Sequence, residues 1–129
     1  SRGLGDVYKR QFPSLVNADL NYVVRGVERV SDMFGDAICV SLYIVNDSRQ
    51  QYSFNLFSTS AKGDGLSSSP SIFTNKKPSF DPNQTLDPKS KARGWLCFDE
   101  PEYGWVPEKI QFSEVMGSTF LTVRVSQKN

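Results

Sequence analysis

Three large aromatic side chains lie close together in one charged stretch of the chain. Trp95, Tyr103 and Trp105 could stack on sugar rings or on proline-rich peptides, because their rings are flat and apolar. The structural alternative is that Trp95 packs over its strand while Trp105 covers an open end of the fold. Because large aromatics dominate the cores of small domains, we favour that alternative and keep the three residues as candidate ligand contacts.

The sequence contains no histidine, and this restricts the chemistry that the chain can perform. Histidine is the most common general base and a frequent zinc ligand, and it activates serine and cysteine nucleophiles. An enzyme would have to use carboxylates alone, such as an Asp/Glu pair at glycosidase separation, and no such pair lies on adjacent predicted strands. We therefore expect a protein that is not an enzyme, with no catalytic residue, metal site or cofactor.

An acidic group follows Trp95 and could in principle bind calcium, which favours clustered carboxylates. Its members are Asp99, Glu100, Glu102 and Glu108. Pro101 and Pro107 separate these side chains, and the spacing matches no calcium loop. We expect a solvated turn.

A basic group precedes Trp95, in which Lys89, Lys91 and Arg93 alternate with other residues. In an extended segment these side chains would share one face and could meet an anionic wall polymer or lipid headgroups. More often such charges protect the edge of a sheet from pairing with another sheet. A net charge of +1 argues against nucleic acid as the partner.

Short strands separated by turn residues are expected along the whole chain, and they number about seven. They cover residues 19–30, 37–45, 51–58, 84–86, 94–98, 109–112 and 119–125. Residues 61–79 are rich in glycine, serine and proline and are expected to be mobile, with Ile72 and Phe73 as a short edge strand. No segment reads as a convincing helix, and we predict an antiparallel sandwich.

The strongest strand, 37–45, has one fully aliphatic face formed by alternate residues, whereas Cys39, Ser41, Tyr43 and Val45 form the other face. Gly26 marks a change of phase in the preceding strand and predicts a bulge. Between the strands at 37–45 and 51–58 we expect either a hairpin or a tight corner.

An ordered set of segments resembles a bacterial family of secreted or lipid-anchored domains of unknown function, similar to the mycobacterial immunoprotective extracellular antigen. The segments run from VSLYIVND through YSFNLFS and a Gly-Asp-Gly loop to GWLCFDEP. Within the family motif the matching positions are Leu86, Pro88, Gly94, Phe98 and Pro101.

The resemblance implies an immunoglobulin-like β-sandwich outside the cytoplasm, secreted or anchored as a lipoprotein. It implies membrane contact only through an N-terminal anchor beyond this sequence, and it assigns no ligand-binding residue. The partner would be an unidentified protein or a wall polymer. Lys89 departs from the motif, which has glycine there, and this puts the geometry of the turn in question.

Cys39 and Cys97 have two interpretations. An oxidising compartment favours a disulfide. However, both cysteines face away from the most aliphatic side of their strands, so a bond through the core would require reversed faces. A cross-strand bond on a shared face requires the two strands to be neighbours. We favour two half-buried thiols, with the disulfide as the alternative.

Residues 1–11 resemble the in-frame translation of a transposase-based sequencing adapter and are expected to be disordered. The remaining residues 12–129 are expected to form one domain. Without Arg2, Lys9, Arg10 and Asp6, the 15 basic and 14 acidic residues become 12 and 13, a net charge of −1. Residues 12–129 are therefore slightly acidic.

Overall fold

The computed structural model describes residues 20–72, 74, 76–114 and 117–125, so the adapter-like segment lies outside the described residues. Within the described ranges there are nine β-strands, a single-turn 3-10 helix at Leu56–Ser58 and no α-helix. The strands are β1 (Leu20–Asp32), β2 (Gly35–Asn46), β3 (Tyr52–Asn55), β4 (Thr59–Gly63), β5 (Leu66–Ser68), β6 (Asn83–Leu86), β7 (Lys91–Asp99), β8 (Lys109–Ser113) and β9 (Thr119–Arg124). No helix in the described part is long and apolar enough to cross a bilayer.

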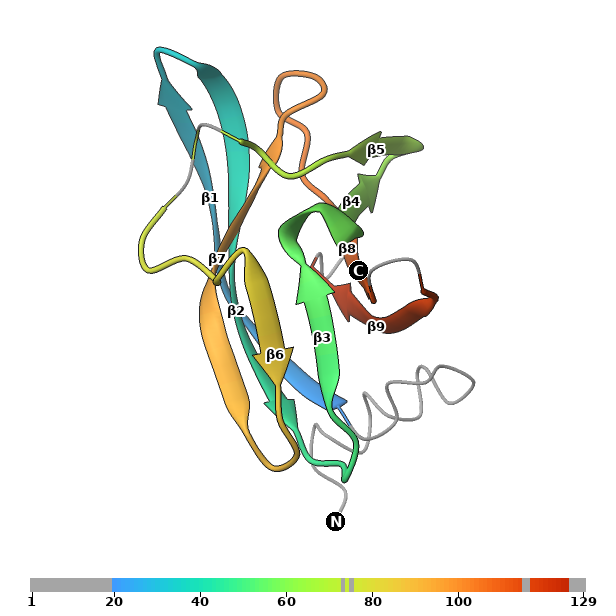
Figure 1. Cartoon of the computed structure of the whole chain (residues 1–129). Helices are drawn as coiled ribbons and strands as arrows, with labels where there is room; N and C mark the ends of the chain where they lie inside the picture. The colour runs from blue at the N-terminus through green and yellow to red at the C-terminus, as the bar shows by residue number, and fades with distance from the viewer. Residues whose placement is uncertain (1–19, 73, 75, 115–116, 126–129) are drawn as a thin grey trace.

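All neighbouring strands are antiparallel and form three sheets, with strand orders β1-β2-β7, β3-β6 and β5-β4-β8-β9. The β1-β2-β7 sheet is one layer, and strands of the other two sheets lie across the core from it (Figure 1). The predicted antiparallel sandwich is confirmed, with nine described strands rather than about seven.

The longest hairpin joins β1 to β2 and pairs Leu20 with Asn46 at one end and Asp32 with Gly35 at the other. The connection is therefore shorter than the interval between the predicted strands at 19–30 and 37–45, because both strands continue into that interval. The register shifts between Val24 and Gly26, which confirms the predicted bulge and leaves Arg25 as the extra residue.

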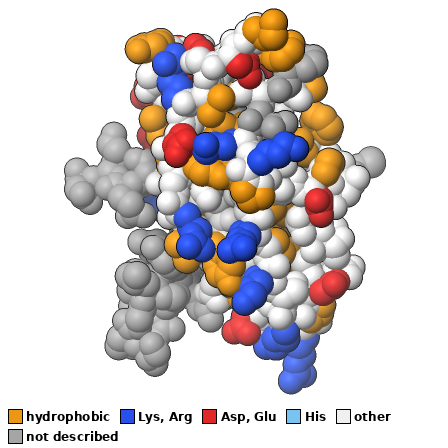
Figure 2. Space-filling view, turned by 90° about the vertical axis from the view of Figure 1, so that its left-hand side faces the viewer, with side chains coloured by type: hydrophobic (Ala, Val, Ile, Leu, Met, Phe, Trp, Pro, Cys, Tyr) orange, Lys and Arg blue, Asp and Glu red, His pale blue; other side chains and the backbone are white. Residues whose placement is uncertain are grey.

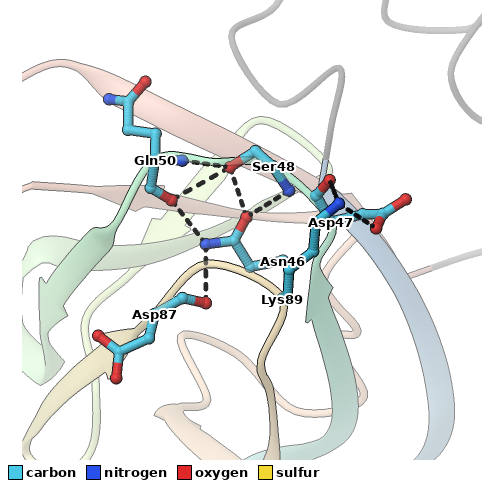
Figure 3. Close-up of polar contacts among 6 residues, drawn as sticks. All are labelled: Asn46, Asp47, Ser48, Gln50, Asp87 and Lys89. Atoms are coloured by element: carbon cyan, nitrogen blue, oxygen red, sulfur yellow. Dashed lines mark hydrogen bonds and ion pairs between the residues drawn. The ribbon is translucent and has the colours of Figure 1, made fainter.

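The chain turns a corner after β2, because β3 pairs with β6 in another sheet. Of the two predicted alternatives, the corner is correct and the hairpin is wrong. At this point Asn46 is fully buried, and its side-chain amide donates to the carbonyl oxygens of Gln50 (2.8 Å), Leu86 (3.0 Å) and Asp87 (3.2 Å). Its Oδ1 accepts from the backbone nitrogen (3.0 Å) and hydroxyl (2.6 Å) of Ser48 (Figure 3). One side chain thus connects the end of β2 to the turn between β6 and β7.

That turn also contains Lys89, whose φ of 63° lies in the left-handed region where the related motif has glycine. The Lys89 ammonium donates to the carbonyl oxygen (3.0 Å) and carboxylate (3.2 Å) of Asp47 (Figure 3). The turn therefore keeps the geometry expected of glycine, although the residue is lysine.

Replacing Asn46 with alanine should lower the free energy of unfolding by about 2 kcal/mol, because several buried polar groups lose their partner. Urea denaturation measures the loss. Asn83→Ala is the matched control, because Asn83 is exposed and its side chain accepts a surface hydrogen bond from Asn55. Equal losses in the two variants would show that the Asn46 connection contributes little.

Residues 59–68 form a hairpin of β4 and β5 that the sequence did not predict. Asp64 and Gly65 make its turn, with φ values of 53° and 77°. The Gly-Asp-Gly loop noted among the resembling segments, Gly63-Asp64-Gly65, therefore lies at the turn of this hairpin, and the expectation of a mobile stretch without strands is wrong for residues 61–68.

The described residues that follow, 69–72, 74 and 76–80, run along the edge of β7 that is not paired with β2, and they are called the edge segment below. Its backbone bonds join Ser71 nitrogen to the Cys97 oxygen (2.9 Å), Asp99 nitrogen to the Ser69 oxygen (3.1 Å) and Trp95 nitrogen to the Pro78 oxygen (2.9 Å). Ile72 belongs to no strand and is exposed, so the edge strand predicted there is wrong; Phe73 lies outside the described residues.

The edge segment approaches β7 so closely that Gly94 has no room for a side chain. A Cβ at Gly94 would lie 2.8 Å from the backbone nitrogen of Phe80. The Phe80 ring is thereby held in the main core with side chains from eight of the nine strands.

Candidate ligand-binding surface

Cys39 and Cys97 form a disulfide between neighbouring strands of one sheet. They are directly opposite each other in the β2-β7 register, with Cα atoms 4.0 Å apart. Both side chains lie on the side of the sheet away from the main core, in a small cluster with Ala37, Val30 and Trp95. The preference for free thiols is therefore wrong, and the alternative of a bond on a shared face is correct. We call this side of the β1-β2-β7 sheet the outer face.

Trp105 is buried, with 4% of its surface exposed, and its indole nitrogen donates to the carbonyl oxygen of Gly63 at 2.9 Å. This position agrees with the structural interpretation and removes Trp105 from the candidate contacts. Tyr103 is 83% exposed, and the Arg29 guanidinium carbon lies 4.3 Å from the centre of its ring.

Glu100 anchors the loop that carries Tyr103 and Trp105. Its side chain is only 2% exposed and accepts from Arg29 Nε at 2.8 Å and from the Gly104 backbone nitrogen at 2.9 Å. The hydrogen bond that Arg29 donates to Glu100 raises the pKa of Arg29 above its ordinary value, so the guanidinium stays charged at any physiological pH. The expected solvated turn is wrong for Glu100.

The acidic group formed by Asp99, Glu100, Glu102 and Glu108 was considered above as a possible calcium site. Among the described residues, no group of three or more Asp, Glu, Cys or His side chains is arranged to hold a metal ion. The four acidic side chains therefore do not converge on one point, and the buried one, Glu100, pairs with Arg29.

Trp95 is half-buried on the outer face and lies over Gly26, where an added Cβ would be 3.7 Å from the indole ring. The Lys76 ammonium lies 5.0 Å from the centre of the indole ring. The Arg29 guanidinium lies against the Tyr103 ring. Arg29 pairs with the core-facing residue Ile38, so its side chain projects from the opposite side of the sheet to Trp95. Trp95, Tyr103 and Trp105 therefore do not form one shared platform.

The outer face instead combines Trp95 with cations from three parts of the chain. Lys91 and Arg93 pair with the outward residues Val45 and Tyr43 of β2, and so they share this face with Trp95. Lys89 is separated from them, because it lies in the turn and binds Asp47.

A second group of cations reaches the same face. Arg25 is the extra residue of the β1 bulge, and its guanidinium carbon lies 5.8 Å from the ring centre of Tyr43. Lys76 belongs to the edge segment and lies over the Trp95 ring. Figure 2 shows Lys and Arg side chains gathered over hydrophobic ones on this side of the molecule. We define the outer basic face as Arg25, Tyr43, Lys76, Lys91, Arg93 and Trp95.

Three members of the outer basic face were not predicted from the sequence, namely Arg25, Tyr43 and Lys76. A signal existed for Tyr43, because it belongs to the non-aliphatic face of the strongest predicted strand. Arg25 and Lys76 carried no such signal. Arg25 points outward because of the bulge in β1. The position of Lys76 depends on where the edge segment lies along β7.

Two shallow hollows lie between these side chains. One of about 180 Å³ is lined by Arg25, Ser41, Pro78, Arg93, Gly94 and Trp95. Another of about 380 Å³ is lined by Tyr43, Lys91, Ala92 and Arg93, so that Arg93 borders both. The surface offers hydrogen-bond donors, positive charge and aromatic carbon, which suit the binding of an anionic ligand.

The fold defines the chain as an antiparallel β-sandwich, and two solved structures resemble it. The yjhA protein from Bacillus subtilis is 18% identical, with a TM-score of 0.52 over 74% of this chain and 73% of that one. MPT63, a secreted protein from Mycobacterium tuberculosis, is 15% identical, with a TM-score of 0.54 over 82% of each chain.

Identities this low establish a common fold and nothing more specific. No protein-family model matches the chain, and no curated protein matches its sequence significantly. The expected resemblance to the mycobacterial family is thus supported by the fold alone.

Proposed function

We propose that this chain is a non-enzymatic interaction or structural module that works outside the cytoplasm, in a bacterial secreted protein or lipoprotein. The observation that carries the proposal is the buried Cys39–Cys97 disulfide. Such bonds persist in oxidising compartments and are rare in a reducing cytoplasm. The secreted MPT63, which shares the fold, adds support.

The non-enzymatic part of the proposal is supported by the residues that the chain offers. The sequence has no histidine, and the disulfide occupies both of its cysteines. The outer basic face brings cations and aromatic rings together without a nucleophile paired to a base.

Carbohydrate or cell-wall-polymer binding is the second candidate function. The half-exposed position of Trp95 beside Lys76 and Arg93 favours it. Trp105 is not available for such binding, and Tyr103 belongs to another surface, so Trp95 is the central aromatic residue for this candidate.

The complete gene tests the proposed location. We expect an export signal upstream of Phe12, with a cysteine at its cleavage site if the protein is a lipoprotein. Mass spectrometry of the protein purified from its native host, alkylated without reductant, should show no modified cysteine. A cytoplasmic domain fused upstream, or alkylation of both cysteines, would overturn the proposal.

A further inference from the structure

We propose that the outer basic face binds an acidic polysaccharide, a chain whose sugars carry repeated carboxylate, sulfate or phosphate groups. The inference rests on the proposed function and gives it a ligand class. It depends on charge, on the arrangement of the cations and on the aromatic side chains between them.

Positive charge is uncompensated at the Lys91 end of this face. Glu28 pairs with Lys76 at 3.1 Å, and the other outward carboxylates, Asp32 and Asp99, lie at the opposite end of the sheet, in register with Gly35 and Ala37. Neither Lys91 nor Arg93 has an ion-pair partner in the part of the chain that the structure describes. Because residues 12–129 carry a net charge of −1, the cations here reflect a local concentration of positive charge.

The cations are spread over the sheet, both along β7 and across it. Lys91 and Arg93 are two residues apart on one side of β7, so their Cα atoms lie about 7 Å apart. Arg25 lies two strands away from Arg93, on β1, at about 10 Å. A set of spaced charges matches anions that repeat along a polymer better than it matches a single small ion.

The aromatic rings favour sugar as the backbone of this polymer. Tyr43 and Trp95 lie under Arg25 and Lys76, and this cation–π contact holds both cations against the sheet. The two hollows beside Arg93 are each lined by an aromatic residue together with hydrogen-bond donors. Sugar rings offer both CH surfaces and hydroxyl groups, so they fit such mixed hollows. Nucleic acid is disfavoured by the overall charge. A bilayer is disfavoured because one exposed aliphatic side chain, Val23, lies next to Arg25 among the described residues, and a single valine offers little apolar surface for insertion.

The first test is calorimetric titration of the full chain with polygalacturonate, whose sugars each carry a carboxylate. Its fully methyl-esterified form keeps the sugars and removes the charge. We expect at least tenfold weaker binding of the ester, and a similar loss at about 1 M salt, where the screening length is about 3 Å. The acidic polymer should also protect Trp95 from iodide quenching, whereas Trp105 is already buried.

The second test compares two variants that each remove two positive charges. Lys91→Gln with Arg93→Gln should weaken binding about tenfold, because two charge-assisted hydrogen bonds are lost. Lys62→Gln with Lys109→Gln is the control, because these paired residues lie in the β5-β4-β8-β9 sheet. The control should change affinity less than twofold, and thermal unfolding confirms that both variants are folded.

The proposal is overturned if neither polygalacturonate nor dextran sulfate binds, if the ester binds as well as the acid, or if the control loses as much affinity. It is also overturned if single-stranded DNA or anionic lipid vesicles bind more tightly through Lys91 and Arg93. An export signal found together with no polysaccharide binding would leave the proposed function standing and remove only this ligand. A cytoplasmic location would remove the proposed function even if the polymer binds.

Discussion

Replacing both Cys39 and Cys97 with alanine should lower the free energy of unfolding by about 4 kcal/mol. The bond closes a loop between residues separated by 58 positions, and without it the unfolded chain gains the corresponding conformational freedom. Small changes in packing accompany this entropic effect, because the sulfur atoms lie in a buried cluster with Val30 and Trp95. Guanidinium denaturation of the variant and the unmodified protein measures the difference.

Reductant provides the control for this prediction. Dithiothreitol reaches the buried disulfide when the protein unfolds. In its presence, the free energy of unfolding of the unmodified protein should fall by a similar amount, whereas that of the double alanine variant should not change. A variant loss below about 1 kcal/mol would mean that the bond hardly constrains the unfolded chain. No response of the unmodified protein to reductant would lead to the same conclusion.

Phe54→Ala should destabilise the fold by about 3–5 kcal/mol, because it removes a large side chain from the centre of the core. Phe54 is 2% exposed, and its ring centre lies 4.9 Å from that of Phe112, 6.1 Å from Phe80 and 6.4 Å from Phe120. The ring therefore joins β3 to β8, to β9 and to the edge segment. Its loss would leave a cavity bordered by several parts of the fold.

Phe57→Ala is the matched control for Phe54→Ala. Phe57 follows three residues later and is 67% exposed, so its removal should change stability by less than about 0.5 kcal/mol. Urea denaturation of the two variants gives the comparison. Similar losses would mean that the buried position of Phe54 does not determine its contribution.

The sequence predicted best those strands whose own side chains determine their environment. The strand at 37–45 was expected almost at its observed bounds, because four aliphatic residues at alternate positions require burial on one face. Gly26 likewise marked the bulge through a change of phase. Both signals come from neighbouring residues in the sequence. Such a local pattern predicts a strand correctly when the burial of its own side chains determines the structure.

The hairpin of β4 and β5 was missed because its buried residues are small. Thr59, Ala61 and Gly63 face inward, and none has the aliphatic character that marks a strand. A Cβ at Gly63 would lie 2.9 Å from the Val106 oxygen. The strand is therefore specified by the close approach of the loop before β8, which no local pattern encodes.

The candidate surface was predicted only in part for the same reason. Trp95 was identified, but its position relative to Tyr103 and Trp105 depends on which side of the sheet each element occupies. The pairing of Cys39 with Cys97 required β7 to be the neighbour of β2, and the sequence left that arrangement open. Long-range strand order determined both outcomes.

The bond between β2 and β7 also sets how far the molecule can be stretched. Force applied through the two ends of the chain reaches the disulfide before it reaches β3, β4, β5 or β6, which lie between the bonded cysteines. The 58-position separation corresponds to roughly 200 Å of extended chain that cannot be pulled out. Under tension, the domain would therefore lengthen through its terminal strands and then stop, with a covalent limit on its extension.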